Sequence, residues 1–433
     1  MSRAFVLLSA LSALSLAACG APSADDPSDP GDPEAPAPDP VDWTAVQGSC
    51  SVDASAFGTR QGQGLGGTLL ALDPDGEGFL SLDRGPDGAA VATRWTLDGA
   101  ATPVPFANPH HAGWSLTPAG ADVDGDGRDD LFAVAPQGST DDDIAVSDPD
   151  ATLPHLLLSG RDLSVLADLS DVVGYDLPAG SAGIADVDGD ARPEVLVQED
   201  GFFSAIGLDG RLHWTLDLGP DAGSTWVAGD LDGDGAADLL STTWEGVRAL
   251  TTDGAVLWEA DIAWATTLHP MGDLDGDGVD DFLVAYAQDG NGVVEARSGA
   301  TADLLWVHDY DLDGMPASST GFGTDAVALG DQNGDGVDEL LISGDNDTPD
   351  RLITPYGGVV AVLDGATGAA LVDLQAHAPE TGDAVIPHSL APHFGSAILP
   401  LGGDGLRFLV GAAGHPVGDA EDAGAWMVFH CQP

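Results

Sequence analysis

Five nine-residue segments carry acidic side chains at the same positions, and this pattern suits cation binding. They are DVDGDGRDD (122–130), DVDGDARPE (186–194), DLDGDGAAD (230–238), DLDGDGVDD (273–281) and DQNGDGVDE (331–339). Positions 1, 3, 5 and 9 hold a carboxylate or, once, an amide. A tightly curled chain aims alternate side chains at one centre. Hard oxygen ligands in that number favour Ca²⁺ over Mg²⁺, which dehydrates reluctantly. The segments therefore predict about five structural Ca²⁺ sites.

An EF-hand shares the first half of this pattern, but its second half is missing here. An EF-hand loop needs a bidentate Glu at position 12 and a helix on each side. Position 12 is instead occupied by strand-type residues: Ala133, Val197, Ser241, Val284 and Ile342. Position 6 is Gly in four segments, which permits a left-handed turn. The second segment has Ala191 there, so its site is the weakest prediction.

The elements around these segments read as strands. Each segment precedes an apolar run, and most follow a stretch of small and apolar residues. The segments start 64, 44, 43 and 58 residues apart, and further hairpin patterns fill the intervals. Weaker copies lie near Asp73 and Asp404. About seven units of four short strands are typical of a propeller. The sequence predicts an all-β, seven-bladed β-propeller of four-stranded blades with Ca²⁺-binding loops between strands.

The N-terminus has the pattern of an export signal. Residues 1–18 combine Arg3 with a short apolar run, and Leu16-Ala17-Ala18-Cys19 looks like a bacterial lipobox in which Cys19 becomes lipidated. The alternative is an ordinary secretory signal with an incidental Cys19. Residues 19–49 are rich in Pro and Asp and predict a disordered tether. The propeller is expected over 50–433, on a chain that is exported and lipid-anchored to the outer membrane or cell surface.

Two further cysteines mark the ends of the expected propeller. Export implies an oxidising compartment, so we expect a Cys50–Cys431 disulfide, with two unpaired thiols as the alternative. A bond between them requires both ends of the fold to meet, and a ring satisfies this. Residues 425–431 (AWMVFHC) are expected to be the closing strand that completes the first blade.

The loop pattern D-x-[DN]-x-[DN]-G-x-x-[DE] between strands resembles the FG-GAP and VCBS repeats, known from integrin α-subunit propellers and related bacterial proteins. Phe322-Gly323, Phe394-Gly395 and Gly411-Ala412-Ala413 also fit this family. The resemblance covers about residues 50–431. It implies these side-chain ligands: Asp122, Asp124, Asp126 and Asp130; Asp186, Asp188, Asp190 and Glu194; Asp230, Asp232, Asp234 and Asp238; Asp273, Asp275, Asp277 and Asp281; Asp331, Asn333, Asp335 and Glu339. It also implies carbonyl ligands from Arg128, Arg192, Ala236, Val279 and Val337.

The charge of the whole chain excludes several classes of function. The net charge is −60, from 62 Asp and 10 Glu against 12 Arg, and there is no lysine. Schiff-base and P-loop lysine chemistry are therefore excluded. So strong a negative field repels phosphates, so we expect no nucleic-acid partner and membrane contact through the lipid anchor alone. We expect a monomer.

No catalytic residue stands out, because zinc-protease, serine-hydrolase and Cys–His patterns are all missing. The sequence favours a binding or adhesion module with a protein or glycan partner. The alternative is a propeller hydrolase or lyase acting on polysaccharide or phosphoester. The candidate partner-binding loops are 136–152, 343–358 and 373–394, with passive loop variation equally compatible. The loop histidines His110, His111, His377, His388 and His393 are surface residues or metal ligands. The ten tryptophans are expected in blade cores and hairpins, with a sugar-binding face as the alternative.

Overall fold

The structure is a computed structural model, and its regular elements are β-strands. It describes residues 41–432 except 60–62, 72–77, 86–89, 106–114, 120–121, 135–154, 170–181, 188–191, 200, 220, 263–264, 266, 289–290, 311–320, 345–355, 378–392, 402–404 and 417–422. In this part of the chain there is no helix, and hence none of the length and apolar character needed to cross a bilayer.

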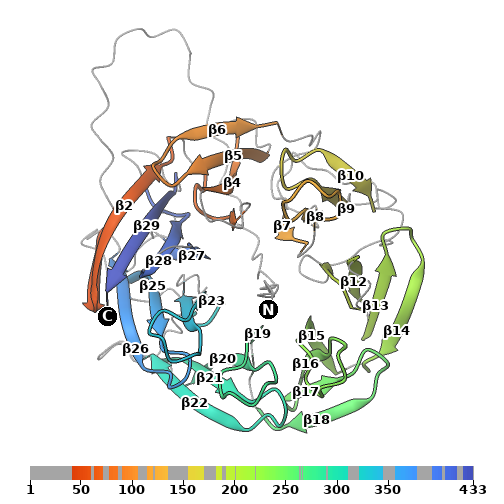
Figure 1. Cartoon of the computed structure of the whole chain (residues 1–433). Helices are drawn as coiled ribbons and strands as arrows, with labels where there is room; N and C mark the ends of the chain where they lie inside the picture. The colour runs from red at the N-terminus through yellow and green to blue at the C-terminus, as the bar shows by residue number, and fades with distance from the viewer. Residues whose placement is uncertain are drawn as a thin grey trace, which may run out of the picture.

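Seven antiparallel sheets stand around a ring, each with its first strand nearest the centre (Figure 1). Blade 1 contains β3 (Leu69–Ala71), β4 (Gly78–Arg84), β5 (Ala90–Thr96) and β6 (Ala101–Val104). Blade 2 contains β7 (Ser115–Pro118), β8 (Leu131–Val134), β9 (His155–Leu158) and β10 (Val165–Asp168). Blade 3 contains β11 (Ala182–Ala185), β12 (Glu194–Glu199), β13 (Phe202–Gly207) and β14 (Leu212–Asp217).

The second half of the ring repeats this order. Blade 4 contains β15 (Ala222–Val227), β16 (Leu239–Thr243), β17 (Val247–Leu250) and β18 (Val256–Ala260). Blade 5 contains β19 (Thr267–Pro270), β20 (Phe282–Gln288), β21 (Asn291–Arg297) and β22 (Leu304–Tyr310). Blade 6 contains β23 (Asp325–Gly330), β24 (Glu339–Gly344), β25 (Tyr356–Leu363), β26 (Ala370–His377) and, outermost, β1 (Trp43–Gln47). Blade 7 contains β27 (Phe394–Pro400), β28 (Leu406–Ala412), β29 (Ala425–Gln432) and β2 (Ser49–Phe57). The predicted all-β, seven-bladed β-propeller is confirmed, with a fifth strand, β1, added to blade 6.

The ring closes in blade 7, and the predicted closing strand was wrong. β29 does not complete the first blade. It is the third strand of blade 7, and the N-terminal β2 pairs along it as the outermost strand. The pattern of apolar residues does not show whether the last strand belongs to the first or to the last blade, because in both arrangements an apolar strand lies beside a terminal strand. The disulfide between Cys50 and Cys431 joins the two strands at facing positions, with a Cα–Cα distance of 4.1 Å. This bond indicates an oxidising, extracellular environment.

The folded region begins before the boundary expected at Cys50. Residues 43–47, assigned above to the tether, form β1 and pair with β26. Val41 is buried, and the Trp43 ring packs edge-on against Phe429 of blade 7 at a centroid distance of 5.0 Å. These contacts bury apolar surface between blades 6 and 7, which holds the segment in place despite its Pro-rich approach.

The core lies between neighbouring blades. Leu340 and Ile342 of β24 pack with blade 5, whereas Leu341 points the other way and packs with blade 7. Successive side chains of a strand point to opposite faces, so a second strand is buried on both sides. This explains why an apolar run follows each acidic segment.

Candidate metal centres

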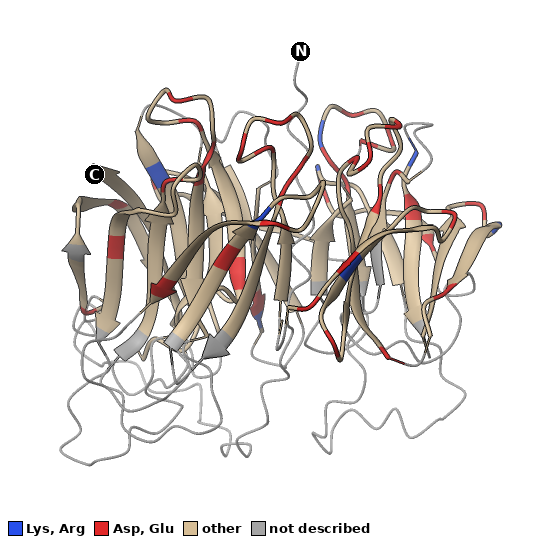
Figure 2. Cartoon of the chain, turned by 90° about the horizontal axis from the view of Figure 1, so that it is seen from below, with Lys and Arg blue, Asp and Glu red and all other residues tan. Residues whose placement is uncertain are grey.

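The five acidic segments connect the first and second strands of blades 2 to 6, one segment in each blade. Strands in an antiparallel meander alternate in direction, so all five loops reach the same end of the ring. Figure 2 shows acidic residues along the loops at this end. The weak motifs near Asp73 and Asp404 fall in the corresponding connections of blades 1 and 7, outside the described residues.

Backbone amides fix the conformation of each fully described loop. In blade 4, Asp230 accepts hydrogen bonds from the amides of Gly233, Asp234 and Gly235 at 2.6, 3.0 and 2.8 Å. The loops of blades 2 and 5 repeat this set. Gly233 and Gly235 have φ of 81° and 93°, while a Cβ added to either would meet open space. Glycine is therefore required by the left-handed backbone, at position 4 as well as at the predicted position 6.

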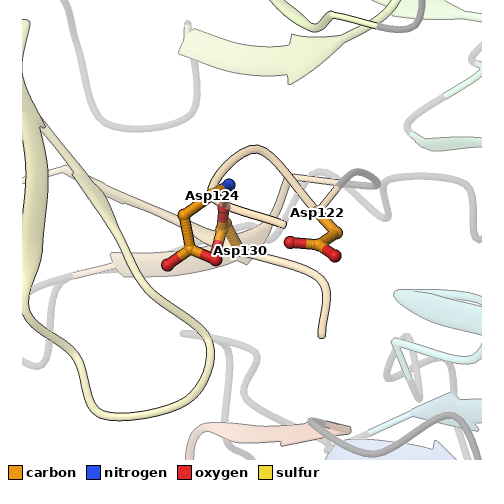
Figure 3. Close-up of side chains that lie close together, drawn as sticks. All are labelled: Asp122, Asp124 and Asp130. Atoms are coloured by element: carbon orange, nitrogen blue, oxygen red, sulfur yellow. Dashed lines mark hydrogen bonds between the residues drawn. The ribbon is translucent and has the colours of Figure 1, made fainter. Parts of the chain in front are cut away.

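Three loops gather three carboxylates each within metal-binding distance. One oxygen from each of Asp122, Asp124 and Asp130 lies within 4.8 Å of the others (Figure 3). The same holds for two further groups: Asp230, Asp232 and Asp234; Asp273, Asp275 and Asp281. The fourth predicted carboxylates of these loops, Asp126, Asp238 and Asp277, lie outside the groups. The structure therefore brings together three of the four predicted side-chain ligands in each loop.

The position-9 acids are buried, whereas the other acids of the loops are more exposed. Asp238 and Asp281 are 2% and 1% exposed and accept hydrogen bonds from the position-2 amides of Leu231 and Leu274 at 2.8 and 2.7 Å. Burial, followed by the charges of the other loop carboxylates, raises the pKa of Asp238 and of Asp281 to about 6. A cation bound among these carboxylates would favour their ionised form, and so would offset both the cost of burial and the repulsion between them.

Two glycines that bind the position-9 acids were missed by the sequence analysis. The amide of Gly160 donates to Asp130 Oδ1 at 3.1 Å, and that of Gly299 donates to Asp281 Oδ1 at 2.9 Å. Both lie in the hairpin before the outermost strand of the same blade. The available signal was a Ser-Gly or Asp-Gly pair that recurs at this place, at 159–160, 298–299 and 364–365.

The loop of blade 6 differs from the others. Asn333 Nδ2 donates to Asp335 Oδ2 at 3.2 Å and to Asp364 Oδ2 at 3.1 Å. Glu339 is fully buried, and its Oε1 has no hydrogen-bond partner within the described part of the chain. A buried carboxylate oxygen without a donor is costly unless a cation balances it.

The loop of blade 3 is described in part. Asp188, Asp190 and Ala191 lie outside the described residues. Glu194 is buried, and its Oε2 accepts the amide of Val187 at 3.1 Å, as in the other loops.

These observations test whether the residues fit a cation. Clustered carboxylate oxygens and the orphaned Glu339 Oε1 form a hard, negatively charged donor set, which suits a divalent cation. The acidic clusters could therefore bind metal ions. The predicted carbonyl ligands at position 7 stay a prediction.

The remaining predicted positions lie mostly outside the described residues. These are Cys19, His110, His111, His388, segment 136–152 and most of 343–358 and 373–394. His393 is buried directly before β27, so it is not a surface histidine. Of the tryptophans, Trp226, Trp306 and Trp426 are buried, whereas Trp244 is exposed.

No protein-family model matches the chain. No curated protein matches it in sequence. Among solved structures, the V. cholerae biofilm matrix protein Bap1 aligns at 21% identity and a TM-score of 0.37 over 60% of this chain and 38% of its own. The chain thus spans well under half of that protein. The exotype rhamnogalacturonan lyase YesX aligns at 16% identity and a TM-score of 0.45, over 89% of this chain and 75% of its own. BBS1N, in complex with ARL6DN, aligns at 12% identity and a TM-score of 0.37, over 78% and 98%. These likenesses carry no argument about function.

Proposed function

We propose that the protein is an exported, lipid-anchored β-propeller of the FG-GAP type, stiffened by about five Ca²⁺ ions, that binds a protein or glycan partner. The observation that carries the proposal is the recurrence of an acidic segment at the same end of blades 2 to 6, fixed by the same backbone hydrogen bonds in blades 2, 4 and 5. A repeated site on a ring supports a structural role, because a catalytic centre needs one location.

The loop geometry also favours structural over catalytic metal. In the blade-4 loop, the Asp230 carboxylate already accepts three backbone amides, and Asp232 and Asp234 accept one each. Carboxylates fixed by backbone amides in this way form a preorganised site, as a structural ion needs. When bound, Ca²⁺ would supply positive charge that offsets the repulsion between them. Asp230, Asp232 and Asp234 would hold it.

The opposite end of the ring supports partner binding. Trp244 lies in the turn between the second and third strands of blade 4, at the end away from the acidic loops, and is 86% exposed. Thr243 fixes this turn: its amide donates to Gly246 O at 2.7 Å, and its Oγ1 accepts the Gly246 amide at 3.0 Å. Phe202, at the corresponding turn of blade 3, is half exposed. Large aromatic side chains held in water on rigid turns are typical of binding surfaces.

The N-terminal segment supports attachment at the rim. β1 enters blade 6 at Trp43, which pairs with Ala376 near the end of β26. Residues 19–42 would then link this point to a lipidated Cys19. An exported location agrees with the disulfide.

The proposal is tested with the Ca²⁺-loaded protein and a Trp244→Ala variant, which leaves the core intact. Both are assayed on a glycan array and on cell-envelope fractions pretreated with protease or periodate. We expect saturable binding that Trp244→Ala weakens at least tenfold at an unchanged melting temperature. Loss after protease would identify a protein partner, and loss after periodate a glycan. Turnover in a parallel hydrolase and lyase screen, abolished by the same variant, would replace the binding role with the enzymatic alternative.

A further inference from the structure

We propose that a cation bound in the acidic loop of blade 5 stabilises the contact between blades 4 and 5, through a relay formed by Trp258, Gly299 and Asp281. The inference rests on the proposed Ca²⁺ role. It adds that the cation acts across the boundary between two blades, in addition to ordering its own loop.

The relay consists of two hydrogen bonds that meet at one residue. The Gly299 amide donates to Asp281 Oδ1, within blade 5, at 2.9 Å. The Gly299 carbonyl accepts the indole Nε1–H of Trp258, from β18 of blade 4, at 2.7 Å. A cation that fixes Asp281 would therefore also restrain the carbonyl that blade 4 uses as its acceptor.

Packing leaves this glycine little freedom. A Cβ at Gly299 would lie 1.9 Å from the carbonyl oxygen of Asp280 and 2.8 Å from Leu231 Cδ2 of blade 4. The Trp258 ring stacks on Phe282, the residue after Asp281, at 5.6 Å and 14°. The carboxylate, the glycine and the indole are thus held together by both blades.

Negative charge lies across the same boundary. A Cβ at Gly229 of blade 4 would lie 1.9 Å from Asp280 Oδ2 of blade 5, so this carboxylate rests directly against Gly229. Gly229 immediately precedes Asp230, the first acid of the blade-4 loop. Without cations, the carboxylates of the two loops repel across the boundary, and a cation in either loop reduces this repulsion.

The arrangement recurs with variation, which supplies a natural control. Between blades 1 and 2, Arg94 donates to Gly160 O at 3.1 Å, and Gly160 donates to Asp130. Between blades 5 and 6, Trp306 Nε1 donates to Gly365 O at 2.7 Å. There the relay is incomplete, because Glu339 Oε1 has no hydrogen-bond partner among the described residues. Trp306 should therefore stabilise the contact between blades 5 and 6 equally whether or not the blade-6 loop binds a cation.

Hydrogen–deuterium exchange of the full mature protein, with and without Ca²⁺, tests the relay because it resolves each strand. In the wild type, Ca²⁺ should slow exchange about fivefold in both the Ser298–Asp303 hairpin and β18, as expected for one net hydrogen bond. Trp258→Phe keeps the ring stacking and removes the N–H. It should retain the Ca²⁺ effect in the hairpin and reduce it below about twofold in β18. Asp273→Asn, which removes a blade-5 ligand, should abolish both effects.

Trp306→Phe is the matched control. It should speed exchange of β22 equally with and without Ca²⁺. The relay is wrong if Ca²⁺ protects β18 in Trp258→Phe as strongly as in the wild type, or if Asp273→Asn leaves that protection intact. Protection of the hairpins in every blade without any effect on β18 would overturn the relay while sparing the Ca²⁺ sites. Absence of Ca²⁺ protection in all loops would overturn both.

Discussion

Removing the Cys50–Cys431 disulfide should destabilise the propeller strongly, because it closes almost the whole chain. The two cysteines are 381 residues apart. For a loop of this length, the chain-entropy relation gives a stabilisation of about 6 kcal/mol at 25 °C. The folded region spans residues 41–432, so its unfolding entropy is about 0.8 kcal/mol/K. The melting temperature of a Cys50→Ser/Cys431→Ser variant should therefore fall by about 7 °C.

Differential scanning calorimetry in saturating Ca²⁺ measures this shift. The control is the wild type with a reductant, which breaks the bond without introducing buried hydroxyls. It should show the same decrease, and the double variant should not respond to reductant. A shift below about 2 °C in both would refute the reasoning that the bond stabilises the fold by restricting the entropy of the unfolded chain.

Three further predictions concern the acidic loops. Five sites with Kd of about 0.5 mM would together add about 7 kcal/mol to the free energy of unfolding at about 5 mM Ca²⁺. Replacing EDTA with Ca²⁺ should therefore raise the melting temperature by about 9 °C. An unchanged melting curve would contradict this. In EDTA, the melting temperature should rise as the pH falls from about 7.5 to about 5. The folded pKa of Asp238 and Asp281, about 6, exceeds the ordinary 3.8, so folding favours the protonated carboxyls. Asp238→Asn should make the melting temperature in EDTA less dependent on pH. Calorimetry across that pH range measures this dependence, and a melting temperature that falls with falling pH would contradict the prediction. Asn333→Asp adds a carboxylate beside Asp335 and Asp364, so it should lower the melting temperature in EDTA and raise it in Ca²⁺. A shift of the same sign in both conditions would count against cation binding in blade 6.

Much of the architecture could be predicted because each acidic segment shows where one blade lies in the sequence. Each acidic segment precedes a second strand that is buried on both faces, so the motif and the apolar run identify the same point in every blade. The two weak motifs fall in the two remaining blades. The paired cysteines required the chain ends to meet, and the structure places them in neighbouring strands.

Other features depend on contacts between distant residues, which patterning does not encode. The terminal strands have the same alternation whichever blade they complete, so the sequence could not show that β2 belongs to blade 7. Trp43 becomes partly buried through contact with Phe429, which lies almost the whole length of the chain away. Gly299 looks like an ordinary turn glycine until Asp281 and Trp258 are seen on either side of it.

We expect the acidic loops of blades 2 to 6 to be Ca²⁺ sites. Equilibrium dialysis of the mature protein against millimolar Ca²⁺, followed by elemental analysis, measures this directly. We expect about five Ca²⁺ per chain, and one fewer in Asp273→Asn. A count of two or fewer, or one that Asp273→Asn does not change, would contradict it.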